Sequence, residues 1–290
     1  MPTTFSYSAF GLAVDSELEL DGFVPRNDAR APDVTVMRGT PAANGNEGQH
    51  AMAYAQGVLS ARVEDGRRLV VSPDDGADPR YVSAVITGEL FSVVLRQRGL
   101  AVVHGSAVAK DGRAVGFVGD SGWGKSTLAA SLVERGWRLM TDDLLVVGGL
   151  GTDAPPTAIP THPSMRLSEE AFAQVDGAGV RKGRAHAMTS KLRVDQAATF
   201  AERPAPLARI WLLMPGTTDE HASEPLSGVQ AVHELVRHTR GKRLLGAPSF
   251  KAMLLRQCAD LARRVPVHAL YRRYGLEHIG SLCDLVEAEA

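Results

Sequence analysis

A glycine-rich segment near the middle of the chain limits its possible folds more than any other part. The segment reads Gly119-Asp-Ser-Gly-Trp-Gly-Lys-Ser-Thr127 and fits the pattern G-x-x-x-x-G-K-[ST], the Walker A pattern. The apolar run Val115–Val118 precedes it, and the helix-favouring run Lys125–Glu134 follows it. A strand, a glycine-rich loop and a helix in this order let backbone N–H groups surround phosphate groups. The sequence therefore predicts a phosphate-binding loop, a P-loop, at residues 119–127.

The chemistry expected of this loop follows from its residue types. Gly119, Gly122 and Gly124 let the backbone approach an anion closely. The Lys125 ammonium can reach the β- and γ-phosphates of a nucleotide, and the Ser126 hydroxyl can bind Mg²⁺. We expect the rest of the loop to contact the nucleotide as well, namely Asp120, Ser121, Trp123 and Thr127. The indole of Trp123 either stacks on a base or substrate, or packs against its own domain.

Two adjacent carboxylates follow the loop at a distance that suits a return strand. Asp142 and Asp143 lie in the run Arg138–Val147, which we expect to form a strand beside the P-loop strand. Paired carboxylates in a strand are costly unless positive charge is near, and Mg²⁺ and Lys125 would supply it. Because successive strand residues point to opposite faces, one carboxylate can bind Mg²⁺ through water while the other accepts a proton from a hydroxyl. The alternative is that the pair caps a turn.

Further polar residues are secondary candidates. His104 follows the apolar run Leu100–Val103, and a histidine in that position is either a packed residue or part of the site. Arg166 can contact the γ-phosphate or the acceptor through its planar fork, or lie on the surface. The basic run Arg181–Lys191 forms either a flexible lid with Lys191 as its main contact, or a solvated loop. The clusters Arg240-Gly-Lys-Arg243 and Arg272-Arg273 are expected on solvated faces.

The chain divides into two parts by the period of its apolar residues. Residues 1–98 are β-rich and end in a connecting helix, Pro79–Arg98, with a loop at Pro41–Gly48. The strands expected there are Phe5–Phe10, Ser16–Leu20, Val34–Arg38, His50–Tyr54, Val58–Val63 and Arg67–Ser72.

Residues 99–290 alternate strands with helices, which predicts an α/β core that carries the P-loop. The expected strands are Leu100–Val103, Gly105–Ala109, Ala114–Val118, Arg138–Val147, Leu207–Met214 and Val265–Leu270. The expected helices are Lys125–Glu134, Val229–His238, Phe250–Arg263 and Ile279–Ala288. The Gly- and Pro-rich stretch Gly148–Pro163 is expected to be a loop.

Composition excludes several classes of protein. The 290 residues are 44% hydrophobic and 22% charged, which is ordinary globular composition, and the net charge of −1 creates no basic field for nucleic acid or anionic lipid. Cys258 and Cys283 cannot make a disulfide framework, and neither has a histidine at zinc-ligand spacing. No run of about 20 apolar residues exists, and residues 1–15 do not read as a secretory signal, so we expect a cytoplasmic protein.

Three features resemble the catalytic domain of HPr kinase/phosphorylase, a bacterial P-loop protein-serine kinase. They are the pair His104-Gly105, the loop Gly119–Ser126, and the segment Arg135-Gly-Trp-Arg-Leu-Met-Thr-Asp-Asp143, where the family reads Arg-Gly-His-Arg-Leu followed shortly by Asp-Asp. The match is specific over Val103–Val147. The chain looks most similar to the HPr kinase-related proteins, which include kinases that modify the C-terminal serine of lasso-peptide precursors.

The resemblance implies a role for each matched residue. Asp142 would be the general base that activates a substrate serine, Asp143 would position Mg²⁺ or the phosphates, and His104 would lie near Asp142 and tune it. The implied fold is a P-loop core of the phosphoenolpyruvate-carboxykinase/HPr-kinase type, a mixed sheet with helices that is often oligomeric. Only Gly183-Arg184-Ala-His186 loosely matches the family's phosphorolytic segment, which puts that reverse activity in doubt. The N-terminal strands do not obviously match the family's own N-terminal domain, so the acceptor need not be HPr.

Three functions are compatible with these residues. The first is an ATP- and Mg²⁺-dependent kinase whose acceptor is a serine on a small protein or peptide, either an HPr-like carrier or a peptide precursor. A second is a metabolite or sugar kinase on the same core, with residues 1–98 and the basic run enclosing a small hydroxyl compound. The third is a regulatory module that binds a nucleotide without transferring phosphate.

Overall fold

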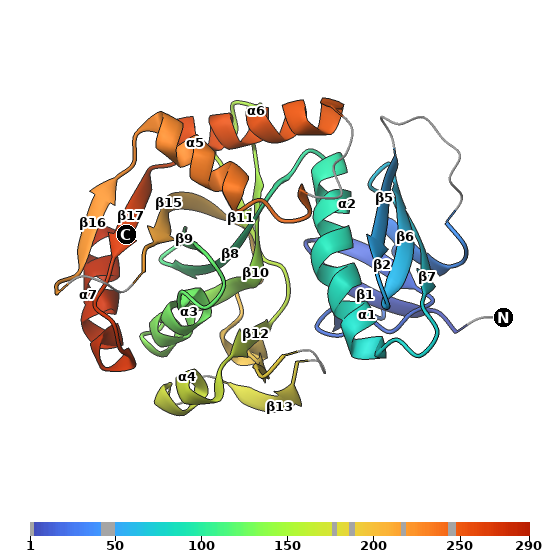
Figure 1. Cartoon of the computed structure of the whole chain (residues 1–290), viewed down its shortest axis with the longest axis horizontal. Helices are drawn as coiled ribbons and strands as arrows, with labels where there is room; N and C mark the ends of the chain where they lie inside the picture. The colour runs from blue at the N-terminus through green and yellow to red at the C-terminus, as the bar shows by residue number, and fades with distance from the viewer. Residues whose placement is uncertain (1–2, 42–49, 176–178, 186–188, 216–218, 243–247) are drawn as a thin grey trace.

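The computed structural model describes residues 3–41, 50–175, 179–185, 189–215, 219–242 and 248–290. Within them the chain forms two large sheets, one small sheet and seven α-helices (Figure 1). The fold is therefore a mixed α/β fold, as the sequence predicts. Most of the loop expected at Pro41–Gly48, together with His186 and Arg243, lies outside the described residues.

The N-terminal sheet has the strand order β3-β1-β2-β4-β7-β6-β5, in which β2–β4 and β4–β7 are parallel pairs. Its strands are β1 (Phe5–Ala9), β2 (Leu12–Ser16), β3 (Val24–Pro25), β4 (Val34–Arg38), β5 (His50–Ala55), β6 (Leu59–Glu64) and β7 (Arg68–Pro73). The expected strand Ser16–Leu20 is wrong, because the strand ends where that segment begins. The Ser16 hydroxyl donates to the Leu18 carbonyl and accepts from the Leu18 N–H, and this local turn replaces strand pairing.

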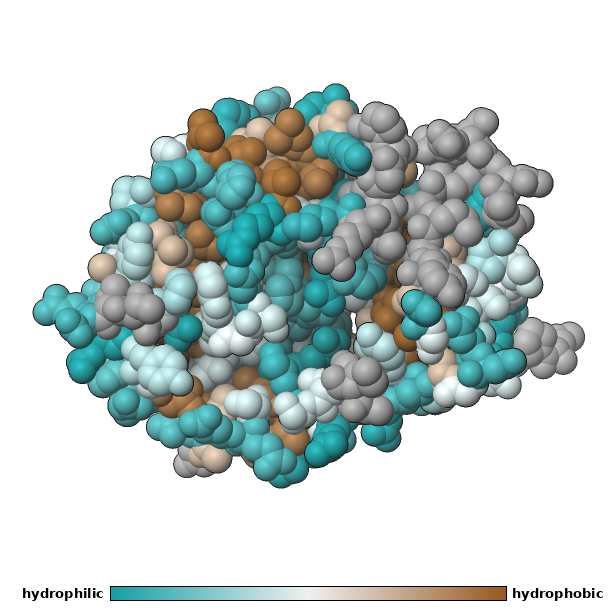
Figure 2. Space-filling model, in the orientation of Figure 1, coloured by the Kyte–Doolittle hydropathy of each residue, from teal (hydrophilic) through white to brown (hydrophobic). Residues whose placement is uncertain are grey.

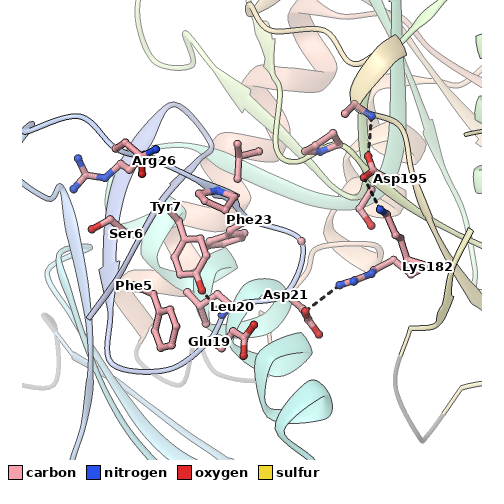
Figure 3. A pocket seen from close by; sticks show the side chains of 18 of the residues that line it. Phe5, Ser6, Tyr7, Glu19, Leu20, Asp21, Phe23, Arg26, Lys182 and Asp195 are labelled. Carbon is pink, nitrogen blue, oxygen red and sulfur yellow. Dashed lines mark hydrogen bonds and ion pairs between the residues drawn. The ribbon is translucent and has the colours of Figure 1, made fainter. Parts of the chain in front are cut away.

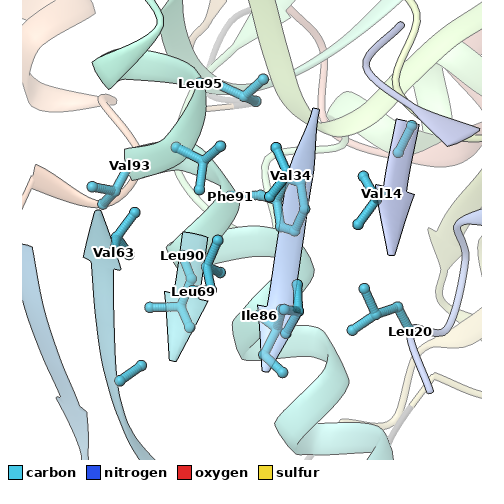
Figure 4. Packing of buried hydrophobic residues seen from close by; sticks show 14 of the residues in the cluster. Val14, Leu20, Val34, Val63, Leu69, Ile86, Leu90, Phe91, Val93 and Leu95 are labelled. Carbon is cyan, nitrogen blue, oxygen red and sulfur yellow. The ribbon is translucent and has the colours of Figure 1, made fainter. Parts of the chain in front are cut away.

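One helical segment covers this sheet, and it lies where the sequence predicts the connecting helix Pro79–Arg98. It comprises α1 (Pro79–Val85), the π-helical turn η1 (Ile86–Leu90) and α2 (Phe91–Gln97), and Asp78 caps its start by accepting from the Arg80 N–H. The apolar face of the segment is buried against the sheet (Figure 4). Its contacts include Ile86, Leu90, Phe91 and Leu95 on the helices and Val14, Val34, Val63 and Leu69 on the strands.

The second sheet has the order β11-β10-β8-β9-β15-β17-β16. Its strands are β8 (Ala101–Lys110), β9 (Arg113–Val118), β10 (Arg138–Gly148), β11 (Thr157–Ile159), β15 (Ala205–Leu213), β16 (Ala222–Pro225) and β17 (Val267–Tyr271). The expectation that β10 lies beside the P-loop strand β9 is wrong, because β8 lies between them and pairs antiparallel with both. The hairpin β8–β9 turns at Asp111-Gly112, where both residues have positive φ, so the P-loop strand has β8 as its immediate neighbour.

Helices cover both faces of the second sheet (Figure 1). On one face α3 (Lys125–Glu134) and α7 (Ile279–Glu289) share a buried cluster with Phe117 and Trp211. On the other face α5 (Gly228–Arg237) and α6 (Pro248–Arg264) share a cluster with Val118 and Ile210. Residues of these strands therefore alternate between two hydrophobic cores, one on each face of the sheet. Two single-turn 3-10 helices, η2 (Ala197–Thr199) and η4 (Leu276–His278), lie in the connections.

Two segments expected to be loops contain strands, one of them in a small third sheet and the other in the second sheet. The third sheet has the order β12-β14-β13, from Ser164–Leu167, Leu192–Asp195 and Val180–Arg184, and α4 (Glu169–Gln174) follows β12. The first half of the basic run is therefore strand β13, with all five residues exposed. The stretch expected as the loop Gly148–Pro163 also contains β11, a strand too short to show periodicity.

A cavity of about 770 Å³ lies between the N-terminal sheet and the small sheet (Figure 3). An ion pair between Asp21 and Arg193, 3.0 Å apart, joins the two sheets beside it. The P-loop and the paired carboxylates line a different cavity. None of the helices in the described part of the chain is long and apolar enough to cross a membrane.

Candidate active site

The P-loop connects the end of β9 to the start of α3. Gly119, Gly122 and Gly124 have φ values of 148°, 87° and 82°, so each uses a backbone conformation that side chains disfavour. A Cβ atom at Gly119 would lie 3.2 Å from the Leu213 carbonyl oxygen. The strand, loop and helix order expected from the sequence is present, and the loop backbone can approach an anion at the start of α3.

Lys125 begins α3 and points back over the loop. Its ammonium donates to the carbonyl oxygens of Gly119, at 2.9 Å, and Asp120, at 3.0 Å. Burial lowers the pKa of this amine, although carboxylates nearby favour its charge. The Asp120 side chain lies outside this contact and pairs with Arg237. A phosphate bound in the loop would replace these two carbonyl oxygens as the hydrogen-bond partner of the Lys125 ammonium.

Trp123 packs against its own domain, which is one of the two alternatives left open by the sequence. Its partly buried ring lies against the cluster of α3 and α7, and a Cβ at Gly119 would contact the ring at 3.4 Å. The indole therefore packs between the loop and the hydrophobic cluster of α3 and α7.

Asp142 is buried on β10, with 4% of its surface exposed. One carboxylate oxygen accepts from the Ser106 hydroxyl at 2.7 Å, and the other accepts from the backbone N–H of Arg166 at 2.8 Å. Both donors are neutral groups. Ser106 was missed by the sequence reasoning, although it follows His104 by two residues and strand periodicity places both on one face.

Asp143 is surrounded by basic side chains. Its carboxylate lies 3.1 Å from Nδ1 of His104, 3.6 Å from the guanidinium of Arg166 and 3.7 Å from that of Arg240. Burial opposes ionisation, but Arg240, Arg166 and His104 outweigh it and hold the pKa of Asp143 well below its usual range. His104 thus contacts Asp143, whereas the resemblance places it near Asp142.

The two carboxylates do not point to opposite faces of the sheet, so that expectation is wrong. Asp143 has a φ of 142°, which interrupts the alternation of β10, and both carboxylates line one cavity. The Thr141 hydroxyl donates to the Leu144 carbonyl across the pair and fixes this irregular backbone. Strained non-glycine conformations of this kind cluster at functional sites.

The cavity at the P-loop has a volume of about 360 Å³. Its lining consists of His104, Ser106, Ser121, Gly122, Lys125, Ser126, Asp142, Asp143, Arg166, Thr189, Lys191 and Arg240. The structure therefore brings together the proposed catalytic residues and both secondary candidates, Arg166 and Lys191. Five other loop residues fall outside this lining, namely Gly119, Asp120, Trp123, Gly124 and Thr127.

Two basic clusters expected on solvated faces are placed differently. Arg240 is partly buried and pairs with Asp143, because the turn after α5 lies beside β8, where the His104 N–H donates to the His238 carbonyl. Arg272 is partly buried, donates to the Met214 carbonyl, and would lie 3.7 Å from a Cβ atom at Gly124. Arg273 and Lys242 are exposed as expected.

The donor set suits Mg²⁺ only if phosphate and water complete the coordination. Within the described ranges no three His, Cys, Asp or Glu side chains cluster closely enough to hold a metal by themselves. The Ser126 hydroxyl and the two carboxylates do line one cavity with the phosphate loop. Mg²⁺ characteristically uses one or two protein oxygens together with substrate phosphates, so these residues fit that ion.

Gly105 lies where β8 and β9 approach too closely for a side chain. A Cβ atom there would stand 2.5 Å from the Phe117 carbonyl oxygen, and a backbone atom cannot move aside cheaply. We expect Gly105→Ala to lower the free energy of unfolding by about 1–3 kcal/mol, measured by urea denaturation. Gly228→Ala, at a position with open space, is the control and should change it by less than about 1 kcal/mol. An unchanged stability in Gly105→Ala would contradict the packing.

His162, between β11 and β12, predicts an acid-sensitive fold. Its Nδ1 is buried without a hydrogen-bond partner in the described part of the chain, and burial lowers its pKa to about 4. Below pH 6.5 His162 binds a proton in the unfolded chain but stays neutral in the folded chain, so the free energy of unfolding falls as the pH drops towards 4. His162→Leu should reduce this loss by up to about 3 kcal/mol in urea titrations between pH 7 and pH 4. The exposed control His233→Leu should keep the wild-type slope, and equal slopes in all three proteins would refute the prediction.

Comparisons with known proteins give a short sequence match and structural neighbours. No protein-family model matches the chain. HPr kinase/phosphorylase from Prosthecochloris aestuarii is 50% identical over 48 residues, which is 17% of this chain and 14% of that protein. The HPr(Ser) kinase/phosphatase structure from Coxiella burnetii has a TM-score of 0.34 and 13% identity, covering 65% of this chain and 89% of that one. The sequence match supports an HPr-kinase-like relationship over the segment that it covers.

Proposed function

We propose that this chain is an ATP- and Mg²⁺-dependent kinase that transfers the γ-phosphate to a serine hydroxyl on a small protein or peptide. One observation carries the proposal: a single cavity contains the P-loop residues Lys125 and Ser126 together with Asp142 and Asp143. Phosphoryl transfer needs a phosphate cradle, a metal site and a group that accepts the hydroxyl proton, and these residues supply each of them. The similarity to HPr kinase/phosphorylase supports the same reaction class.

Asp142 is assigned the role of general base. The low pKa of Asp143 makes it a weak proton acceptor, since two guanidinium groups and His104 stabilise its charge. Asp142 lines the same cavity, and its carboxylate accepts hydrogen bonds from two neutral donors, the Ser106 hydroxyl and the Arg166 backbone N–H, rather than from charged groups. In the proposed step the serine oxygen forms a bond to the γ-phosphorus, the bond to the ADP oxygen breaks, and the serine proton moves to Asp142.

The remaining residues position phosphate and metal. Lys125 neutralises the β- and γ-phosphates, while Ser126 and Asp143 hold Mg²⁺, which screens the charge of the phosphate oxygens when it is bound. Arg166 and Lys191 contact the transferred phosphate or the acceptor. We also propose that the chain belongs to the HPr kinase-related group, which includes lasso-peptide-tailoring kinases. We further propose that it is located in the cytoplasm.

The test is transfer of label from γ-labelled ATP into a cell extract, with Mg²⁺ or with a chelator. The proposal predicts Mg²⁺-dependent label in protein or peptide, recovered as phosphoserine after hydrolysis. Label confined to low-mass compounds would instead favour a metabolite kinase. Tight nucleotide binding without any transfer would favour a regulatory module, and either result would overturn the proposed acceptor.

A further inference from the structure

A second cavity adjoins the P-loop cavity on the side of the carboxylates. It has a volume of about 460 Å³, and we call it the acceptor chamber. It is lined by Ala55, Leu59, Tyr81, Val85, Glu89, Leu90, His104, Arg237, His238, Thr239, Arg240, Gly241 and Lys242. His104 and Arg240 line both cavities, so the chamber borders the Asp143 side of the site.

The N-terminal part of the chain forms one wall of this chamber. Its apolar side chains Leu59, Tyr81, Val85 and Leu90 come from β6 and from the helical segment that covers the N-terminal sheet. The facing wall is the last residue of α5 and the turn after it, at residues 237–242. Figure 2 shows the surface hollowed between the two parts, with hydrophobic residues on the N-terminal side of the hollow. Side chains from residues 1–98 thus border the candidate active site.

The π-helical turn η1 fixes the boundary between the chamber and the site. It presents Glu89 to Arg240, with carboxylate oxygen and Nε 2.9 Å apart, while the other end of that guanidinium lies 3.7 Å from Asp143. A Cβ atom at Gly88 would lie 3.5 Å from both Arg240 and Asp143. The Arg240 guanidinium, between Glu89 and Asp143, therefore separates the chamber from the paired carboxylates by a single side chain. π-Turns within helices frequently occur at functional sites.

The charges of the chamber are mainly positive. Three cationic side chains, Arg237, Arg240 and Lys242, line it together with the single carboxylate of Glu89. Both arginines have carboxylate partners, whereas the exposed Lys242 ammonium donates to the Arg237 carbonyl. Among the described residues no carboxylate pairs with Lys242, so its charge is available to a partner.

We propose that the acceptor chamber binds an acidic segment of the acceptor polypeptide, with an apolar side chain against the N-terminal wall and a carboxylate beside Lys242. This inference rests on the proposed function, since the bound segment would carry the serine that reaches Asp142. An extended polypeptide fits better than a metabolite because the chamber is open: Tyr81 and Val85 are partly exposed and Lys242 is exposed. Metabolite sites usually enclose most of the ligand.

Two variants test the chamber without touching the P-loop or the carboxylates. Val85→Trp fills the space against the apolar wall, and Lys242→Glu reverses the available charge. Lys251→Glu is the matched control, because it makes the same change on an exposed lysine of α6 outside the chamber. Unfolding curves verify that each variant is folded, and Val85→Ala replaces Val85→Trp if the larger side chain disrupts α1.

The probes are synthetic fluorescent peptides with a central serine, measured by anisotropy in the presence of Mg²⁺ and a non-hydrolysable ATP analogue. One peptide carries aspartates and a leucine next to the serine, a second has lysines in place of the aspartates, and a third has glycine in place of the leucine. We expect the first to bind most tightly. Its affinity should fall about tenfold in Val85→Trp and about three- to fivefold in Lys242→Glu, and should stay within about twofold in Lys251→Glu.

Three results would overturn the inference: equal binding of the acidic and basic peptides, no binding of any peptide, or unchanged affinity in both chamber variants. Because binding is read without transfer, failure of the proposed function is visible separately. Peptide binding that depends on the chamber, with no phosphoserine formed from ATP, would support the chamber as a peptide site and contradict the kinase reaction. Phosphate transfer to an acidic peptide at the same rate in both chamber variants and the wild type would support the kinase reaction and contradict the chamber.

Discussion

Replacing Lys125 with methionine should weaken nucleotide binding about 10- to 100-fold and abolish phosphoryl transfer. The buried ammonium is the cation closest to the loop backbone, and each charge-assisted hydrogen bond to phosphate contributes about 1.5–3 kcal/mol. Methionine keeps the length of the side chain and removes a buried charge, so the free energy of unfolding should change by less than about 1 kcal/mol. Titration calorimetry with MgATP measures the loss directly.

Thermal unfolding provides an independent check on Lys125→Met. A ligand at 100 times its dissociation constant stabilises the folded state by about 2.7 kcal/mol, so MgATP should raise the midpoint of the wild type. With binding 10- to 100-fold weaker, the same concentration should stabilise Lys125→Met by only about 0.4–1.4 kcal/mol. Lys110→Met, at a partly exposed lysine away from the cavity, is the control and should respond like the wild type. A full shift in Lys125→Met would exclude the loop as the phosphate site.

Replacing Asp142 with asparagine should slow transfer about 10²- to 10⁴-fold and leave nucleotide affinity within about threefold of the wild type. Asparagine has the same shape, and its amide oxygen can still accept from the Arg166 N–H. The Ser106 hydroxyl can rotate to accept from the new amide group, so the buried contacts survive. What disappears is a carboxylate that can take the serine proton. Single-turnover measurements with saturating MgATP separate this chemical step from binding.

The control for Asp142→Asn is Asp111→Asn in the β8–β9 turn. Asp111 has positive φ, which asparagine tolerates well, and it lies outside the P-loop cavity. This variant should transfer phosphate at the wild-type rate. If Asp142→Asn also kept the wild-type rate, Asp142 would not be the base, and Asp143 or another proton acceptor would have to take that role.

Local sequence patterns predict most of the elements that build the site. The helix Lys125–Glu134 is predicted to the residue, because the glycine-rich loop defines its start and Gly136 closes it. The helix at residues 79–98 and the strand at residues 138–147 agree within one residue, since each has a long apolar period between clear end signals. Asp111 and Gly112, which form the β8–β9 turn, both have positive φ, a conformation that Asp and Gly accept more readily than most residues.

Contacts between distant segments could not be predicted in this way. Arg240 belongs to a run of charges that reads as a solvated surface, yet the turn after α5 places it against Asp143. Glu89 lies in the π-helical turn η1 of the N-terminal part, and its ion pair with Arg240 joins segments about 150 residues apart in the sequence. Strand order is equally non-local, because β8 separates β9 from β10 while the spacing alone suggested that they were neighbours.

The conformation of Asp143 explains why strand alternation misassigned the carboxylates. Alternation assumes regular extended backbone, and a φ of 142° breaks it at one residue. Two carboxylates then share a cavity, and Arg166, Arg240 and His104 surround one of them. The sequence shows that the pair needs positive charge nearby, but not that two of the cations come from β12 and from the turn after α5.

The most direct test of the proposed reaction uses one acceptor fraction, purified by its label from γ-labelled ATP, and compares the wild type with Asp142→Asn. Peptide mass spectrometry locates the phosphate, and ADP is quantified in the same reaction. We predict one ADP for each phosphoserine in the wild type with Mg²⁺, and almost none of either with Asp142→Asn. ADP released with inorganic phosphate only, or phosphoserine formed equally by both proteins, would contradict the account.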